Sequence, residues 1–301
     1  MKELSMIRIP MRRGFALVTM LALIAMANGE EKKDEKAAEP PKPAPKSIFP
    51  DKNLENAVRQ QVFSKRDTQD PITADDVKNI STVRGKGMGI KDLTGLEHCQ
   101  ALMSIDLSEN EIVSLAPLKG LSRLQQIIVN HNKIQDLSPL AGIVAIQYLG
   151  IEGNQVKSLE PLKNLERLSS LYADDNQIAD LTPITKLPKL GSIHLKNNRL
   201  TKLDGISNVG REGNIWSLGV SGNQIIDLSP IKGLKPQSFL FLDGNQIADL
   251  GPLIEMMKAD LNGEKRFAPY VQVYLKGNPL NDAGKKQLEE LKSLKVRVRD
   301  R

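Results

Sequence analysis

A single repeated pattern constrains the fold of this chain more than any other feature. Between residues 93 and 280 the pattern L-x-x-L-x-L-x-x-N-x-I-x-x-L-x-P-L occurs eight times. Several positions repeat together at successive spacings of 22, 22, 22, 22, 25, 22 and 33 residues, so units of similar structure are expected to stack into a solenoid. The repeats are marked by Asn110, Asn132, Asn154, Asn176, Asn198, Asn223, Asn245 and Asn278.

Each repeat contains a short segment with the alternation of a strand. Ile105 and Leu107 are two residues apart and face one side of a strand, whereas Ser104 and Asp106 face the other. One such strand is too short to bury its apolar row, but stacked parallel strands merge these rows into a core. This sequence pattern is typical of leucine-rich repeats and predicts an α/β solenoid.

The asparagine column is interpreted as structural. An amide both donates and accepts, so it can bond the backbone of its own turn and that of the neighbouring coil. Leaving those backbone groups unpaired in the interior would cost about 1–3 kcal/mol per site.

Prolines recur on the return half of each repeat and predict short 3₁₀ or helical turns on the convex side, because proline suits the first turn of a helix. Repeat five has Gly205 in place of proline, and a looser corner is expected there. The prolines are Pro117, Pro139, Pro161, Pro183, Pro230 and Pro252.

Charge and cysteine content exclude some classes of protein. The formal net charge is +6, but residues 1–27 contribute four basic residues against one acidic one, leaving 38 basic against 35 acidic elsewhere. Net charge therefore gives no case for nucleic-acid binding. Cys99 is the only cysteine, which excludes an intrachain disulfide framework.

The N-terminal residues predict export. Residues 1–13 are basic, and an apolar run of 14 follows and ends in Ala25-Met26-Ala27. This is typical of a signal peptide over 1–27; a retained N-terminal anchor is the alternative. After cleavage we expect no membrane span and a secreted, periplasmic or cell-surface location.

Residues 28–47 hold five acidic residues, five lysines and four prolines, and we expect a disordered linker. It would act as a passive leader or as a spacer from a surface.

Residues 48–92 predict a helical N-terminal cap, which an open solenoid needs to cover its core. Asp51 is the expected N-cap of a first helix, and Thr73 with Asp76 forms the capping box of a second. The Gly-rich segment 84–89 lacks the spacing of a phosphate-binding loop and is interpreted as a turn leading into a strand at Ile90.

These features together resemble the internalin-like leucine-rich repeat proteins that bacteria secrete or display. The resemblance covers about 48–280 and rests on the Ile-Phe-Pro-Asp start, the two cap helices and the Asn-x-Ile-x-x-Leu-x-Pro-Leu repeats. It implies a right-handed, curved solenoid whose concave parallel sheet binds a protein partner. The chain shows neither an LPxTG-type anchor nor a downstream immunoglobulin-like domain, which leaves wall attachment and an adhesin-like role unsupported.

The C-terminal end departs from the period. Residues 254–261 predict a longer convex helix. Residues 281–301 predict a cap, in which Leu288, Leu291 and Leu294 share a helical face and 296–299 form an edge strand. Residues 285–301 carry seven basic and three acidic side chains, interpreted as a solvated face, with contact to an acidic surface as the alternative.

Strand alternation also predicts two columns of side chains on the solvent face of the sheet. One column runs Asp106, Ile128, Gly150, Tyr172, His194, Gly219, Phe241, Tyr274, and the other Ser104, Gln126, Tyr148, Ser170, Ser192, Ser217, Phe239, Gln272. Five of the 11 aromatic residues of the chain lie in these columns. Aromatic residues are enriched at binding hot spots, which predicts a partner-binding face; packing of the rings on each other is the alternative. The predicted binding residues are Tyr148, Tyr172, His194, Phe239, Phe241 and Tyr274. Trp216 is expected at the sheet margin.

The sequence offers little for catalysis or cofactors. His131 and His194 lie three repeats apart and cannot share a metal, and Cys99 beside His98 lacks a third catalytic group. Glu152, Asp174 and Asp175 could form a small calcium-binding patch, but acidic residues beside turns are common. We therefore predict a non-enzymatic, monomeric protein-binding module without a cofactor or catalytic residues. The alternative is a structural or self-assembling envelope protein.

Overall fold

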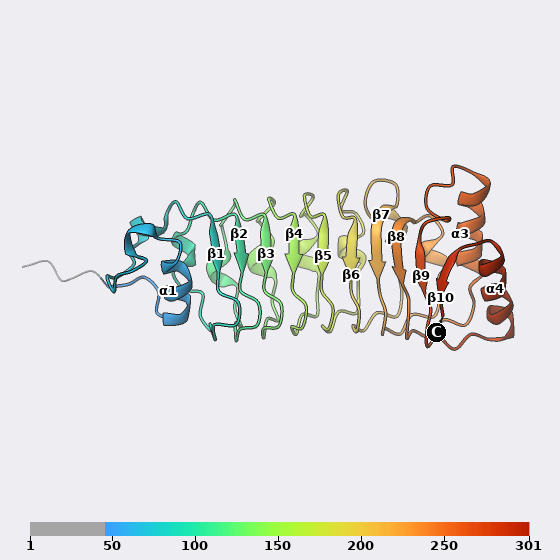
Figure 1. Cartoon of the computed structure of the whole chain (residues 1–301), viewed down its shortest axis with the longest axis horizontal. Coiled ribbons are helices and arrows are strands. Elements are labelled where there is room, and N and C mark those ends of the chain that lie inside the picture. Colours follow the sequence, from blue (N-terminus) through green and yellow to red (C-terminus); the bar gives the residue numbers. More distant parts are fainter. Residues whose placement is uncertain (1–45, 301) are drawn as a thin grey trace, which may run out of the picture. The chain divides into compact units, whose positions relative to one another are not determined.

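The repeats form one parallel β-sheet. The structure is a computed structural model that describes residues 46–300. Its ten strands pair in chain order and every neighbouring pair is parallel (Figure 1). The strands are β1 (Thr82–Arg84), β2 (Ser104–Asp106), β3 (Gln126–Ile128), β4 (Tyr148–Gly150), β5 (Ser170–Tyr172), β6 (Ser192–His194), β7 (Asn214–Gly219), β8 (Lys235–Phe241), β9 (Gln272–Tyr274) and β10 (Arg297–Arg299).

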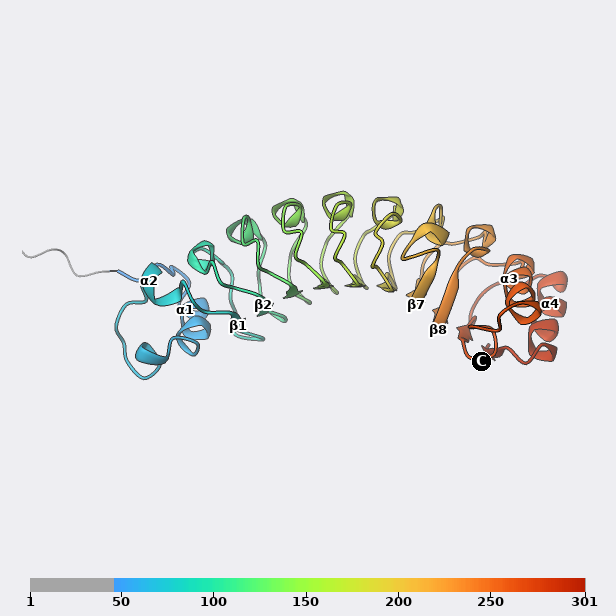
Figure 2. The same cartoon turned by 90° about the horizontal axis from the view of Figure 1, so that it is seen from above.

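Short 3₁₀ turns return the chain from one strand to the next. Within residues 46–300 the strands line the inner side of the arc and the turns its outer side, as Figure 2 shows. The predicted leucine-rich repeat solenoid with a concave sheet and short convex turns is therefore confirmed. The turns are η2 (Leu96–His98), η3 (Ala116–Leu118), η4 (Ser138–Leu140), η5 (Glu160–Leu162), η6 (Thr182–Ile184), η7 (Ile206–Asn208) and η8 (Ser229–Ile231).

The corner without proline remains ordered but changes its form. In the proline-containing corners the 3₁₀ turn starts at the residue before proline, as in η6, whereas η7 starts one residue after Gly205. Gly205 has φ 76°, a left-handed conformation that glycine adopts without steric cost. Gly95, with φ 105°, precedes η2 in the same way. The corner of repeat five is thus displaced along the chain.

The core is a continuous column of aliphatic side chains. Ile105 and Leu107 are completely buried, as are their equivalents through β8. Each fully buried aliphatic side chain contributes about 1.5–3 kcal/mol relative to exposure, so the core outweighs any single surface contact. Asp106, between the two, is only partly buried, which is the alternation expected of a strand with one dry face.

The asparagines join each coil to the one before it. Asn154 accepts a hydrogen bond from the Ile134 N–H at 3.0 Å and donates to the carbonyls of Val129 and Ile151 at 3.0 and 2.9 Å. The same arrangement runs from Asn110, which bonds Ile90 N–H, to Asn278, which bonds Ile247 N–H. A side-chain amide thus satisfies backbone groups that the tight turn leaves without partners.

The N-terminal cap contains α1 (Lys52–Arg59), η1 (Phe63–Lys65) and α2 (Ala74–Val77). Asp51 is the N-cap of α1 and accepts from two backbone N–H groups, and Thr73 and Asp76 form a capping box at α2, so both capping predictions are confirmed. The strand expected at Ile90 is wrong. The strand β1 precedes the Gly-rich turn, within the segment interpreted as helical, and Ile90 follows the turn.

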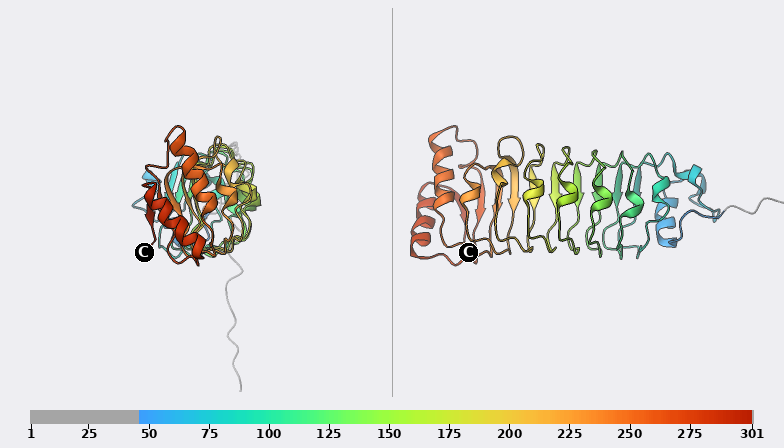
Figure 3. Two further views of the ribbon diagram at one scale, coloured as in Figure 1. Left: turned by 90° about the vertical axis from the view of Figure 1, so that its right-hand side faces the viewer. Right: turned by 180° about the vertical axis from the view of Figure 1, so that it is seen from behind.

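The C-terminal cap contains α3 (Gly251–Asn262) and α4 (Asp282–Ser293), which Figure 3 shows at the end of the row of turns. The longer helix predicted over 254–261 is confirmed by α3, and the terminal strand predicted over 296–299 by β10. The sheet thus has two more strands than the eight repeats, one in each cap. The predicted signal peptide (1–27) and linker residues 28–45 lie outside the described residues.

Candidate functional site

The strand register determines which side chains share the concave face. Tyr148 pairs with Ser170, Tyr172 with His194 and Phe241 with Tyr274, each at equivalent positions of neighbouring parallel strands. These positions alternate with buried leucines, so their side chains project from the open face. We call the group Tyr148, Tyr172, His194, Phe239, Phe241 and Tyr274 the aromatic stripe; all six side chains are partly buried.

The rings of the aromatic stripe contact one another in a continuous row. Centroids lie 5.3 Å apart for Tyr148 and Tyr172, and 4.9 Å apart for Tyr172 and His194. Phe241 then lies 6.0 Å from His194, 5.3 Å from Phe239 and 4.7 Å from Tyr274. Adjacent strands are about 4.8 Å apart, so the paired rings of Tyr172 and His194 stack, whereas Phe241 is tilted against both His194 and Tyr274. The packing alternative is therefore realised, and the row still presents its ring edges to solvent.

On β7 the position that carries a ring on β5, β6, β8 and β9 is Gly219, so the row passes from His194 on β6 to Phe241 on β8. A Cβ atom at Gly219 would lie 2.9 Å from Nδ1 of His194, so only glycine leaves this ring its place. The ring is also held by a 2.9 Å hydrogen bond between His194 Nε2 and Ser217 Oγ. A hollow of about 430 Å³ remains here, which we call the Gly219 notch. Its lining residues are Asp174, His194, Lys196, Gly219, Ser221, Phe241 and Asp243.

A polar column runs beside the stripe, two residues further along each strand. It includes Glu152, Asp174, Lys196 and Asp243 and was not singled out as a column from the sequence. The sequence could have predicted this column, because the alternation of side chains with a period of two continues past the end of each strand. Trp216, expected at the sheet margin, is 60% exposed beside the irregularity in β7.

Burial shifts the pKa of four groups on this face, and it raises the pKa of Tyr148. Burial, and then repulsion from Asp174, raises the pKa of Glu152; burial also raises the pKa of Asp174. Burial lowers the pKa of His194 although Asp174 opposes the shift. The imidazole of His194 is therefore held toward its neutral form, beside the carboxyl groups of Asp174 and Asp243 in the notch.

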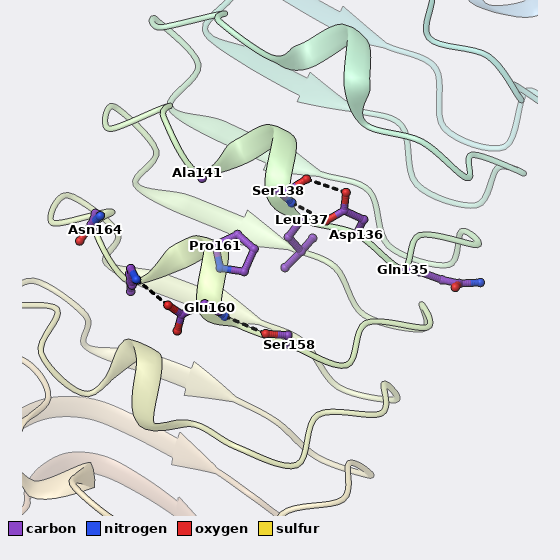
Figure 4. Close-up of a pocket in the computed structure, with 10 residues that line it drawn as sticks. Gln135, Asp136, Leu137, Ser138, Ala141, Ser158, Glu160, Pro161 and Asn164 are labelled. Atoms are coloured by element: carbon purple, nitrogen blue, oxygen red, sulfur yellow. Dashed lines mark hydrogen bonds and ion pairs between the residues drawn. The ribbon is translucent and has the colours of Figure 1, made fainter.

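The convex face has further hollows between successive corners. Figure 4 shows one of about 440 Å³, between η4 and η5, where Ser138 bonds Asp136 and the Glu160 N–H bonds Ser158. A hollow of equal volume lies one coil earlier, between Val113 and Pro139. These hollows follow from the repeat geometry and bring together no distinctive chemistry.

The residues considered for catalysis or metal binding form no such site in the part of the chain that the structure describes. Cys99 is completely buried, and burial raises the pKa of its thiol to about 12, so it is not a reactive nucleophile. Within residues 46–300 no three His, Cys, Asp or Glu side chains are placed to hold a metal ion, Glu152, Asp174 and Asp175 included. In the same residues no helix has the length and apolar character needed to cross a membrane.

Comparison with known proteins places this architecture in a class, the leucine-rich repeat modules, which are generally non-enzymatic and bind other proteins. The family described as "Leucine Rich repeats (2 copies)" matches residues 166–208. The crystal structure of internalin C2 from Listeria monocytogenes is similar, with 30% identity and a TM-score of 0.63, over 69% of this chain and 91% of that one. The chain belongs to the internalin-like leucine-rich repeat proteins.

Two further structures share the fold. A leucine-rich repeat protein of Leptospira interrogans is 18% identical, with a TM-score of 0.56, over 68% of this chain and 56% of that one. The ectodomain of the plant receptor kinase GASSHO1/SCHENGEN3 from Arabidopsis thaliana, in complex with CASPARIAN STRIP INTEGRITY FACTOR 2, is 24% identical. Its TM-score is 0.50, over 64% of this chain and 24% of that one. A comparison with curated proteins gave no match.

Proposed function

We propose that this chain is a non-enzymatic, monomeric protein-binding module of the bacterial cell exterior or periplasm, whose concave aromatic stripe contacts the partner. The observation that carries the proposal is the continuous row of rings from Tyr148 to Tyr274 on a rigid sheet. Rings held in place lose little entropy on binding, which favours their use as hot spots.

The orientation of the rings favours a protein over a flat sugar chain. Tyr172 and His194 are inclined by only 16°, and Phe239 and Phe241 by 15°, so their faces cover each other. A sugar that stacks on an aromatic platform needs an exposed ring face, whereas here the edges point outward. Protein side chains that pack edge-on or between polar groups suit such a surface better.

The exterior location is proposed from the basic and apolar pattern of residues 1–27 and from the similarity to internalin C2. In this arrangement 1–27 is removed, 28–47 is the linker, 48–92 and 281–301 are caps, and 93–280 carries the binding face. We expect light scattering on residues 28–301 to give the mass of one chain.

Site-specific crosslinking tests the binding face. A photoreactive residue at Ser170, beside the stripe on β5, should crosslink to a different protein in cells of the source organism. The same group at Asn164, exposed in the convex corner after η5, is the matched control. The crosslink from position 170 should be lost in the Tyr172→Ala, Phe241→Ala double variant. Crosslinks from 170 to a second copy of this chain would instead support the self-assembling envelope protein.

A further inference from the structure

The Gly219 notch is chemically unlike the rest of the aromatic stripe. The stripe is otherwise a row of touching rings, but at β7 the side chain is missing and a hollow of about 430 Å³ opens. Its apolar wall consists of Phe241 and His194, whose planes are tilted by 48° rather than stacked. A group from a partner can therefore reach ring surface here that is covered elsewhere along the row.

The opposite wall of the Gly219 notch carries charge. One Asp174 oxygen accepts the Lys196 backbone N–H at 2.7 Å, and one Asp243 oxygen accepts the Lys276 N–H at 2.9 Å. The second Asp243 oxygen accepts a long 3.2 Å bond from Ser221 Oγ. These bonds are single and neutral, so both carboxylates retain lone pairs for a further donor. Within residues 46–300 neither aspartate forms a close side-chain salt bridge, although His194 and Lys196 attract Asp174 electrostatically.

The charge around the Gly219 notch favours a cation. Asp174 and Asp243 contribute two negative charges, Lys196 one positive charge, and His194 none in its neutral form. Outside the lining, Glu152 and Asp175 add two further carboxylates near Asp174 and Lys276 adds one ammonium group next to Asp243, so carboxylates outnumber ammonium groups by four to two. Lys196 is solvent-exposed, so its ammonium group can move aside on its flexible chain, whereas the two aspartates are held by backbone donors.

We propose that the Gly219 notch binds the guanidinium group of an arginine side chain from the partner polypeptide. A guanidinium is planar and weakly hydrated, so it can lie against Phe241 while its N–H groups bond Asp174 or Asp243. A lysine ammonium is compact and strongly hydrated and would make less use of the ring wall. This inference rests on the proposed function, because it names the chemistry that a partner places on the concave face.

The test uses a minimal probe on residues 28–301, the chain without the predicted signal peptide. N-acetyl-arginine amide is titrated while the Gly219 amide and the His194 ring are followed by NMR. N-acetyl-citrulline amide, which has the same shape without charge, is the matched ligand control. Saturable shifts confined to the notch with arginine, and none with citrulline at the same concentration, are expected.

Variants then assign the contact. Asp243→Asn and Asp174→Asn should each weaken arginine binding about fivefold, and Lys196→Met should strengthen it by a similar factor, as expected for an exposed charge pair. Gly219→Ala should abolish binding, because its Cβ displaces the His194 ring that forms one wall of the notch. Asp75→Asn, on the exposed surface of the N-terminal cap, is the charge-matched control and should bind like the wild type.

Equal responses to arginine and citrulline, or unchanged binding in both aspartate variants, would overturn the arginine assignment. Loss of the Ser170 crosslink in the ring double variant would still stand in that case, so the proposed function would survive. The opposite combination is also informative. If arginine binds at the notch but the Ser170 crosslink persists in the ring double variant, the stripe is rejected as the partner site and the arginine assignment stands.

Discussion

The rings of Tyr172 and His194 lie with their centroids 4.9 Å apart and their planes inclined by 16°, although 22 residues separate them in the sequence. The contact exists because the two residues are paired in register on β5 and β6. Each ring of the stripe therefore serves as a possible contact for a partner and also supports its neighbour.

This double role sets the expected cost of removing a ring. Tyr172→Ala deletes contacts on both sides, to Tyr148 and His194, and should lower the free energy of unfolding by about 1–2 kcal/mol. Leu171→Ala, its buried neighbour, should cost about 2–5 kcal/mol because it leaves a cavity. Urea unfolding measures both. Equal losses would mean that Tyr172 belongs to the core rather than to the surface.

The column of asparagines also predicts a loss of stability. Asn154→Ala leaves the Ile134 N–H without its acceptor, in a site where Asn154 is only 7% exposed, whereas the carbonyls of Val129 and Ile151 keep their bonds from Asn132 and Asn176. Since a buried unsatisfied group costs about 1–3 kcal/mol, we expect a loss of about 1–3 kcal/mol. Asn164→Ala, in an exposed convex corner, is the control and should unfold like the wild type. A tolerated Asn154→Ala would show that water replaces the amide.

The sequence predicted the repeated part of the fold because one rule, alternation within each rung, governs many residues. It placed Tyr172 and Phe241 in the correct column, and it identified Asp51 and Thr73 as caps from local chemistry. It missed β1, because that coil has Met88 where later coils have asparagine. The β1 coil is completed by Asn110 of the next coil, which bonds the Ile90 N–H, and a local pattern cannot show this.

The candidate site could be predicted only in part for a related reason. Alternation shows which side of a strand faces solvent, but not whether two rings stack or leave a gap. The Gly219 notch depends on an absent side chain on one rung and on His194 and Phe241 on the two adjacent rungs. Such a feature is a property of three coils together, and no single repeat contains it.

The acidic side chains of the concave face predict a pH dependence of stability. Burial, followed by repulsion from Asp174 and Asp175, raises the pKa of Glu152 above its ordinary value of 4.5. The folded state then binds the proton more tightly than the unfolded state. The stabilisation this gives is complete below the unfolded pKa and is lost as pH rises through the folded pKa.

Glu152→Gln isolates this effect, because the amide oxygen can still accept from Asn130 Nδ2. The variant should match the wild type near about pH 4 and be more stable by up to about 1 kcal/mol at about pH 7. Thermal unfolding at several pH values measures the difference. Glu166→Gln, on an exposed convex position, serves as the control and should show no such trend. If Glu152→Gln were less stable than the wild type at neutral pH, the expected direction of the effect would be wrong.

The last prediction concerns one buried ion pair in the N-terminal cap. Arg59 and Glu55 are 6% and 5% exposed and bond each other across one turn of α1. Arg59 also donates to the carbonyls of Lys65, Thr68 and Asp70, at 3.1, 3.1 and 2.9 Å. One guanidinium therefore holds the whole loop from 60 to 71 against the helix.

Removing that guanidinium leaves a buried carboxylate whose one remaining charged partner is the exposed Lys52, beside a hydrogen bond to Ser47. Burial acts to raise the pKa of Glu55, and its hydrogen bonds to Lys52 and Arg59 hold the pKa below its ordinary value, so Arg59→Met should raise it. Breaking one side of a buried pair typically costs about 3–5 kcal/mol. Because each coil contacts only its neighbours, we expect the loss to open the cap before the central strands.

Hydrogen exchange of backbone amides can show which region of Arg59→Met opens first. In Arg59→Met the amides of 60–71 and α1 should exchange faster, while those of β5 and β6 keep their rates. Arg66→Met is the matched control, since Arg66 lies in the same loop but is exposed beside Phe63. Glu55→Leu combined with Arg59→Met should recover part of the loss, because no charge is then left buried alone. Equal exchange in the Arg59 and Arg66 variants would show that the ion pair does not hold the loop.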